Sequence, residues 1–138
     1  MSALVLVSVG ARAAQADGTP DISASVSSSS ALLGDAVHVH ATAHNPNGQP
    51  YGYNLSFRVV LPEGVTYAGG GPVAPQQIAD APNPGERTLI FENVSDLSPG
   101  STKELEFDLE YSSSIYDAGD SFPVVVQAFV NDDARYVP

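Results

Sequence analysis

From residue 20 onward, apolar and polar residues alternate with a period of two, and clusters of Gly, Pro, Asn and Asp interrupt the alternation. This period is typical of strands that bury one face, whereas the 3.6-residue period of helices is nearly absent. The stretch 69–87 is rich in turn formers, and we expect a long loop there with one short edge strand near 76–78. The pattern predicts strands over these other ranges: 22–27, 36–44, 53–60, 65–67, 88–94, 103–111 and 122–130.

Two segments, 36–44 and 103–111, alternate most regularly and predict which side chains face the core. Their inward positions are Val37, Val39, Ala41 and Ala43, then Leu105, Phe107, Leu109 and Tyr111. Their outward positions are His38, His40, Thr42 and His44, then Glu104, Glu106, Asp108 and Glu110. One face of each strand must therefore be solvated. The same rule predicts an inward Tyr53.

About seven strands separated by turns predict an all-β fold, an antiparallel immunoglobulin-like β-sandwich. A chain of 138 residues, 43% of them hydrophobic, is expected to form one domain with a core of ordinary size. We place the sandwich at 22–133, after a linker at 17–21. Residues 134–138 are interpreted as the start of a linker to a downstream region.

The N-terminal residues form a short apolar run followed by Ala14-Gln15-Ala16. Such a run is too short to span a bilayer as a helix but suits the apolar part of a signal peptide, and the small-x-small triplet suits its cleavage site. We therefore interpret 1–16 as a signal-peptide remnant that is removed after Ala16. In the alternative interpretation, residues 4–9 form an extra edge strand.

The charge balance is strongly acidic, with 16 Asp and Glu against five Lys and Arg and a net charge of −11. Binding to phosphate backbones or anionic lipid needs clustered cations, so nucleic acid is not an expected partner and membrane insertion is not expected. The chain has no Cys. Disulfides, thiolate nucleophiles and thiolate metal sites are therefore excluded.

The outward His38 and His40 lie about 7 Å apart on one strand, and an acidic neighbour such as Glu92 would make a third ligand for zinc. The alternative, which we favour, is a solvated face whose charge depends on pH. The carboxylates at 104–110 are likewise interpreted as a solvated stripe, because acid–base catalysis by two carboxylates needs a cleft between them.

Four acidic residues at predicted strand ends form a candidate calcium site. A seven-stranded sandwich would gather them at the pole where the chain leaves, and calcium prefers such carboxylate oxygens. The simpler alternative, which we favour, is that these four residues are ordinary solvated acids. No other cofactor is expected. The candidate ligands are Asp35, Asp96, Asp132 and Asp133.

Several motifs occur in a familiar order: Gly34-Asp35 before an alternating strand, an Asn-rich turn at 45–47, VVLPEGVTY at 59–67, LSPGS at 97–101, and a valine-rich last strand. Over about residues 20–133 this order resembles the conserved-repeat immunoglobulin-like modules of bacterial cell-surface and adhesin-type proteins. The resemblance implies a non-enzymatic stalk, spacer or adhesive unit outside the cell, often in tandem and attached to the wall.

Some relatives within that resemblance form a Lys–Asn isopeptide cross-link between their first and last strands. Asn131 suits the last strand, but the one lysine of this chain is Lys103, so we expect no cross-link.

The first functional hypothesis is thus an extracellular structural or adhesion module, with neighbouring domains of the same surface protein as partners, and a host or matrix protein or a glycan as a further partner. The alternative is a carbohydrate- or protein-binding domain that uses 69–87, Tyr51 and Tyr67. An enzyme is not expected, because no nucleophile motif or converging acid pair is present.

Overall fold

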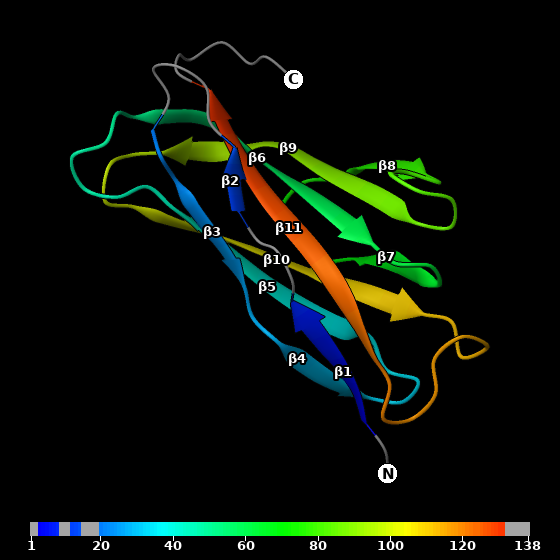
Figure 1. Ribbon diagram of the computed structural model, residues 1–138. Coiled ribbons are helices and arrows are strands. Elements are labelled where there is room, and N and C mark those ends of the chain that lie inside the picture. The colour runs from blue at the N-terminus through cyan, green and yellow to red at the C-terminus, as the bar shows by residue number, and fades with distance from the viewer. Residues whose placement is uncertain (1–2, 9–11, 15–19, 132–138) are drawn as a thin grey trace.

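The computed structural model describes residues 3–8, 12–14 and 20–131 of the chain (Figure 1). Two short strands come first, β1 (Ala3–Ser8) and β2 (Arg12–Ala14). Nine strands follow from Ser23 onward: β3 (Ser23–Val26), β4 (Ser29–Leu32), β5 (Val37–His44), β6 (Gly52–Leu61), β7 (Val65–Gly69), β8 (Gln76–Ala79), β9 (Arg87–Leu97), β10 (Thr102–Tyr111) and β11 (Ser121–Asn131). Among these described residues, no helix is long and apolar enough to cross a membrane.

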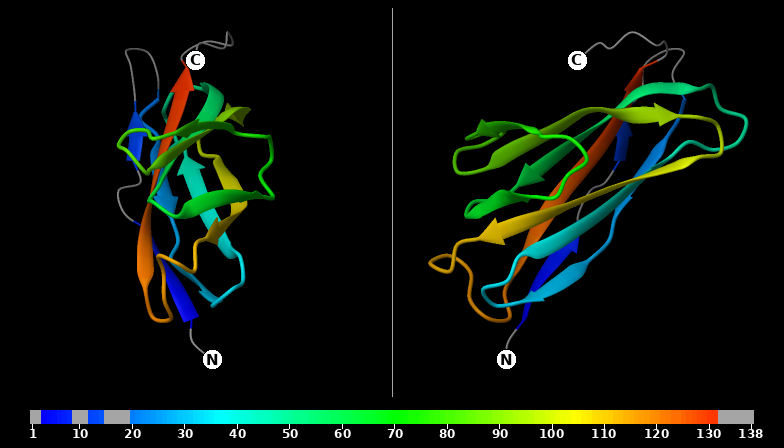
Figure 2. Two further views of the ribbon diagram at one scale, coloured as in Figure 1. Left: turned by 90° about the vertical axis from the view of Figure 1, so that its right-hand side faces the viewer. Right: turned by 180° about the vertical axis from the view of Figure 1, so that it is seen from behind.

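The strands form two sheets that pack face to face (Figure 1 and Figure 2). The larger sheet has the order β4-β1-β11-β6-β9-β8, with β2 beside β11, and the smaller has the order β3-β5-β10-β7. All pairings among β3 to β11 in the described chain are antiparallel. The predicted all-β antiparallel sandwich is confirmed, with nine strands from Ser23 onward in place of about seven.

The core lies between the two sheets and contains the inward positions that alternation predicts. Val37, Val39, Leu105 and Phe107 are fully buried, whereas Tyr111 is half-buried at the end of its strand. Burial of these apolar side chains is the main force that holds the two sheets together. The largest fully buried side chains are Phe57, Phe91, Phe107, Phe122, Leu55, Leu61, Leu89, Leu97, Leu105 and Leu109.

The prediction fails at the start of β6, where two asparagines have left-handed backbone conformations. Asn54 has φ 56° and Asn93, on the neighbouring β9, has φ 48°. The register between the two strands shifts on both sides of Leu55. Such an irregularity changes which residues face inward, because side-chain direction follows the register. The inward prediction for Tyr53 is therefore wrong: the buried positions here are Gly52, Asn54 and Leu55, and Tyr53 is only half-buried.

The first and last strands of the described chain run side by side. β1 pairs in parallel with the start of β11, and β2 pairs in parallel with its end. β1 begins at one pole of the molecule and β11 ends at the opposite pole (Figure 1). Residues 3–8 form a strand, as our alternative interpretation expects, but this strand lies between β4 and β11 and not at the edge of the sheet. Removal of residues 1–16, which would take this strand away, stays a prediction. The downstream-linker interpretation concerns 134–138, which lie outside the described residues.

Candidate functional site

The densest group of chemically capable side chains lies on the exposed face of the smaller sheet. We call it the β5–β10 ladder; it consists of His38, His40 and His44 on β5 and of Glu104, Glu106, Asp108 and Glu110 on β10. The two strands pair antiparallel without a break, which places His38 opposite Asp108 and His40 opposite Glu106. Because the apolar residues between them face the core, the imidazoles and carboxylates project together into solvent.

His38 bridges two carboxylates of the ladder. Its Nδ1 lies 2.8 Å from Asp108 Oδ1, and its Nε2 lies 3.1 Å from Glu106 Oε1. A carboxylate only accepts hydrogen bonds, so both contacts are hydrogen bonds only when both ring nitrogens carry a proton. The bond to Asp108, followed by that to Glu106, raises the pKa of His38 above its usual 6.5, against the lowering effect of partial burial.

The other two imidazoles also reach β10. His40 Nε2 lies 3.3 Å from Glu104 Oε1, and His44 Nδ1 lies 2.8 Å from Thr102 Oγ1. The strands that flank this pair in the sheet, β3 and β7, contain no Asp, Glu, His, Lys or Arg, so the charged groups of this face come from β5 and β10. The arrangement can bind and release protons, with His38 as its most strongly paired group.

Metal binding is not what the ladder geometry provides. Both nitrogens of His38 already face carboxylates, and Glu92, the third zinc ligand considered from the sequence, lies on β9 of the other sheet. Among the described residues, no group of three or more His, Asp or Glu side chains is placed to hold a metal ion. The structure therefore does not bring Glu92 to His38 and His40.

The candidate calcium ligands are also distributed over the molecule. Asp35 precedes β5, whereas Asp96 lies near the end of β9, where Asn45, just after β5, binds the Leu97 carbonyl. The two acids are thus separated by the length of β5, about 26 Å for eight residues. Asp96 Oδ1 instead accepts a hydrogen bond from the Asn54 N–H at 3.0 Å and supports the irregularity in β6. Asp132 and Asp133 lie outside the described residues.

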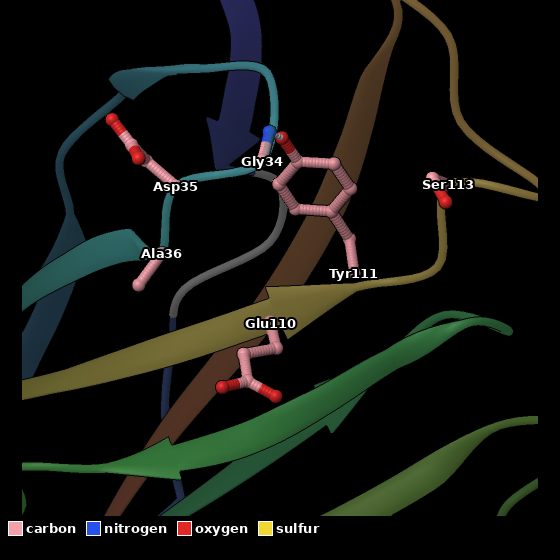
Figure 3. Close-up of a pocket in the computed structure, with 6 residues that line it drawn as sticks. All are labelled: Gly34, Asp35, Ala36, Glu110, Tyr111 and Ser113. Atoms are coloured by element: carbon pink, nitrogen blue, oxygen red, sulfur yellow. Dashed lines mark hydrogen bonds between the residues drawn. The ribbon is translucent and has the colours of Figure 1, made fainter.

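A shallow pocket of about 330 Å³ lies between the β4–β5 turn and the end of β10 (Figure 3). Its lining includes the carboxylates of Asp35 and Glu110, which point away from one another in Figure 3. The Tyr111 hydroxyl accepts a hydrogen bond from the Gly34 N–H at 2.6 Å and donates one to the Leu32 carbonyl at 3.3 Å. The tyrosine therefore holds the turn in place, and the two acids do not converge on a common point.

The tyrosines considered for ligand binding have different environments. Tyr67 packs against the core, with its ring centroid 5.8 Å from that of Phe91, and its hydroxyl accepts a bond from the Gly71 N–H. Tyr51 is 41% exposed and lies against Tyr53, with 4.7 Å between ring centroids and 34° between ring planes. The exposed aromatic pair is therefore Tyr51 and Tyr53. The predicted loop 69–87 contains the predicted edge strand, observed as β8.

Asn45 is a buried polar residue that sequence reasoning missed. Its side-chain Nδ2 donates to the carbonyls of Pro50 and Leu97, at 2.9 and 3.0 Å, and its backbone N–H donates to Ser101. It joins the β5–β6 turn to the β9–β10 turn at one pole. The available signal was an Asn at the end of a regular strand and directly before Pro46.

A scan of protein-family models and a search of curated proteins return no match to this chain. The resemblance to bacterial surface modules therefore stays a prediction, and function must be argued from the geometry.

Proposed function

We propose that the chain is an extracellular structural or adhesion module of a bacterial surface protein. In this role it is a non-enzymatic stalk or spacer that holds neighbouring domains apart. The observation that carries the proposal is the parallel pairing of β1 with β11, the first and last strands, whose outer ends lie at opposite poles.

This pairing determines how the sandwich resists tension along its length. Pulling at Ala3 and Asn131 slides β1 and β11 past one another in opposite directions. Because the two strands slide along their own length, the hydrogen bonds between them are loaded together and not broken one at a time. Four register pairs join β1 to β11, and three more join β2 to β11. A domain with this seam is suited to carry load between its neighbours.

The exposed position of the acidic groups supports a non-enzymatic role. Catalysis by carboxylates or imidazoles needs groups that converge in a water-excluding cleft. The His38 side chain is 56% exposed on the open face of a sheet, and the two acids of the described pocket diverge.

Single-molecule force spectroscopy of the full chain, with handles at its two ends, tests the mechanical role. Val5→Pro removes a backbone N–H from β1, which has a neighbouring strand on each side, whereas Val5→Ala keeps it. We expect Val5→Pro to lower the unfolding force markedly and Val5→Ala to lower it little. Equal forces for the two variants would show that the seam does not bear the load.

The extracellular setting has its own test. Antibodies raised against the folded domain should label intact cells of the source organism, and protease added to those cells should remove the label. Label that appears only after the cells are broken open would contradict an extracellular location.

The Tyr51–Tyr53 pair favours a second candidate function, a carbohydrate- or protein-binding domain. Aromatic rings at a surface offer large contact areas for such ligands. The control is Ile115→Ala, because Ile115 is 46% exposed in the segment between β10 and β11. In a screen of the full chain against immobilised glycans, binding that Tyr51→Ala abolishes and Ile115→Ala retains would support this candidate over the stalk.

A further inference from the structure

The strand β1 fills a slot between two other strands of the larger sheet. It pairs antiparallel with β4 on one side, from Ala3 opposite Leu32 to Leu6 opposite Ser29. On the other side it pairs in parallel with β11, from Val5 opposite Ser121 to Ser8 opposite Val124. Within the described chain, β1 is the one strand that pairs with β4. The slot therefore accepts an extended strand through main-chain hydrogen bonds on both sides.

The first residues of β11 have a sequence that can also form the edge of a sheet, without β1 beside them. Pro123, opposite Val7, has no N–H to donate. Proline inside sheets is characteristic of edge strands and of the first residues of strands. The pairing of β11 with β6 begins only at Val125, so β1 is the strand registered with Pro123. This part of β11 is thus compatible with an open edge as well as with a bound strand.

Charge does not protect the slot from strands of other molecules. Natural edge strands usually carry charged side chains that prevent pairing between molecules. In a chain with 21 charged residues, none lies in 3–8, 22–34 or 121–131, which contain the occupant of the slot and its two walls. An identical uncharged strand from a second copy meets the same walls.

The N-terminal strands are joined to the sandwich at one pole. Ala14, the last residue of β2, lies opposite Phe129 near the end of β11. Pro20, where the described chain resumes, lies close to Gly52 and Val130 at the same pole. The five intervening residues reach at most about 20 Å when extended. Residues 3–14, which we call the N-terminal arm, can therefore cross only to a molecule whose same pole is adjacent.

We propose that the slot between β4 and β11 is a strand-acceptor site, and that in the assembled protein it holds the N-terminal arm of a second copy. Reciprocal exchange of identical arms gives a closed two-fold dimer joined through the pole where β11 ends. The exchange replaces each contact within a molecule by the same contact between molecules, so it requires no new interface chemistry. This inference rests on the proposed adhesion role, for which it names the partner as a second copy.

The Cys-free chain allows a direct test by disulfide trapping. Val5 and Ser30 are register partners across β1 and β4, a spacing that a disulfide can bridge. Full-length Val5→Cys and Ser30→Cys chains are mixed, incubated long enough for arms to exchange, and oxidised. We expect a Val5–Ser30 disulfide between chains, seen as a shift from 14.3 kDa to twice that mass. Val5→Cys mixed with Ser113→Cys, which lies in the exposed β10–β11 turn, is the matched control and should give no preferred cross-link.

The double variant Val5→Cys/Ser30→Cys provides the complementary test. Under oxidising conditions at low concentration, an internal disulfide locks each arm in its own slot, and the protein should then sediment as a monomer at all concentrations. Reduction should restore the dimer. A wild-type chain that remains monomeric at high concentration, together with equal cross-linking of the test and control pairs, would overturn the exchange.

Failure of this proposal is distinguishable from failure of the proposed function. A monomer whose unfolding force falls with Val5→Pro retains a load-bearing seam but has no exchanged arm. Mass spectrometry of the chain from its own cells adds a further criterion. Retention of residues 3–14 supports exchange, whereas their removal overturns both the exchange and the load-bearing seam, because β1 is then missing.

Discussion

The strand pairs β5–β10 and β6–β9 are both antiparallel, but they differ in regularity. β5 and β10 pair through eight consecutive residues without a break, from His44 opposite Thr102 to Val37 opposite Leu109. β6 and β9 shift register twice between Gly52 and Phe57. The first pair separates apolar from polar side chains cleanly. The second brings Asn54 into the interior and leaves Tyr53 beside Tyr51 at the surface.

The difference shows what controls the direction of a side chain. In the regular pair, each residue follows the two-residue period, so hydrophobicity alone determines its face. In the irregular pair, the left-handed conformation of Asn54 interrupts that period, and the Asp96 carboxylate stabilises the interruption by accepting the Asn54 N–H. Local backbone conformation therefore overrides the hydrophobic pattern for a few residues.

The largest expected effect is the loss of unfolding free energy when an aromatic side chain is truncated. This loss should be much larger on β10 than on β6. Phe107 on β10 is fully buried, 5.2 Å from Phe91 and 6.1 Å from Tyr67 between ring centroids. We expect Phe107→Ala to cost about 3–5 kcal/mol of unfolding free energy because it leaves a cavity. Tyr53→Ala on β6 should cost only about 1 kcal/mol, mainly through its contact with Tyr51. Urea unfolding measures both, and a larger loss for Tyr53→Ala would restore its inward assignment.

The next effect concerns the backbone of the irregular pair. Asn54→Ala places an alanine at φ 56°, which should cost about 1–2 kcal/mol. Asn54→Gly should cost less, because glycine adopts that conformation without steric strain. The Asn54 side chain adds little to oppose this, since its buried Nδ2 has no partner among the described residues. Equal losses for the two variants would mean that the side chain, and not the backbone conformation, matters at this position.

Much of the fold was predictable from sequence because it depends on local alternation. The inward faces of β5 and β10 follow from Val37 to Ala43 and from Leu105 to Leu109. β4 was not predicted as a strand, since Ser29 to Leu32 lacks a clear alternation and is defined by its pairing with β1. Similarly, nothing local indicates that Asn54 and Asn93 have positive φ, because asparagine tolerates several backbone conformations.

The site was predictable only in part, because its geometry depends on which strands are neighbours. Alternation correctly placed the three histidines and the four acids on outward faces. It did not reveal that β5 lies beside β10, so the bridging of Asp108 and Glu106 by His38 was not foreseen. The proposed gathering of Asp35 and Asp96 assumed a common pole, and the strand order places them at opposite ends of β5.

A smaller effect should appear in the pH dependence of the regular pair. The pKa of His38 is raised in the folded state, so folding takes up protons. The stabilisation is fully present below the unfolded pKa of about 6.5 and is lost as pH rises through the higher folded value. Unfolding free energy should therefore decrease as pH increases through this window. Chemical unfolding between pH 5.5 and 8.5 measures the slope, which His38→Gln should reduce.

A histidine without a carboxylate contact provides the control for that slope. His44 lies against the neutral Thr102 hydroxyl, so His44→Gln removes an imidazole of the same strand but keeps the His38 bridge. Equal slopes for wild type and His38→Gln would contradict the charged bridge.

The smallest expected effect is the coupling between His38 and one of its two acids. Their side chains are 56% and 55% exposed, so water screens the attraction of His38 for Glu106. A double-mutant cycle with His38→Gln and Glu106→Gln at pH 6 should give a coupling of about 0.2–1 kcal/mol, which decreases with added salt. The matched cycle with Glu110→Gln, which replaces an acid outside the bridge on the same strand, should give no coupling. Comparable values in the two cycles would show that His38 responds to the general acidity of β10, whereas a clear difference assigns the interaction to the His38–Glu106 hydrogen bond.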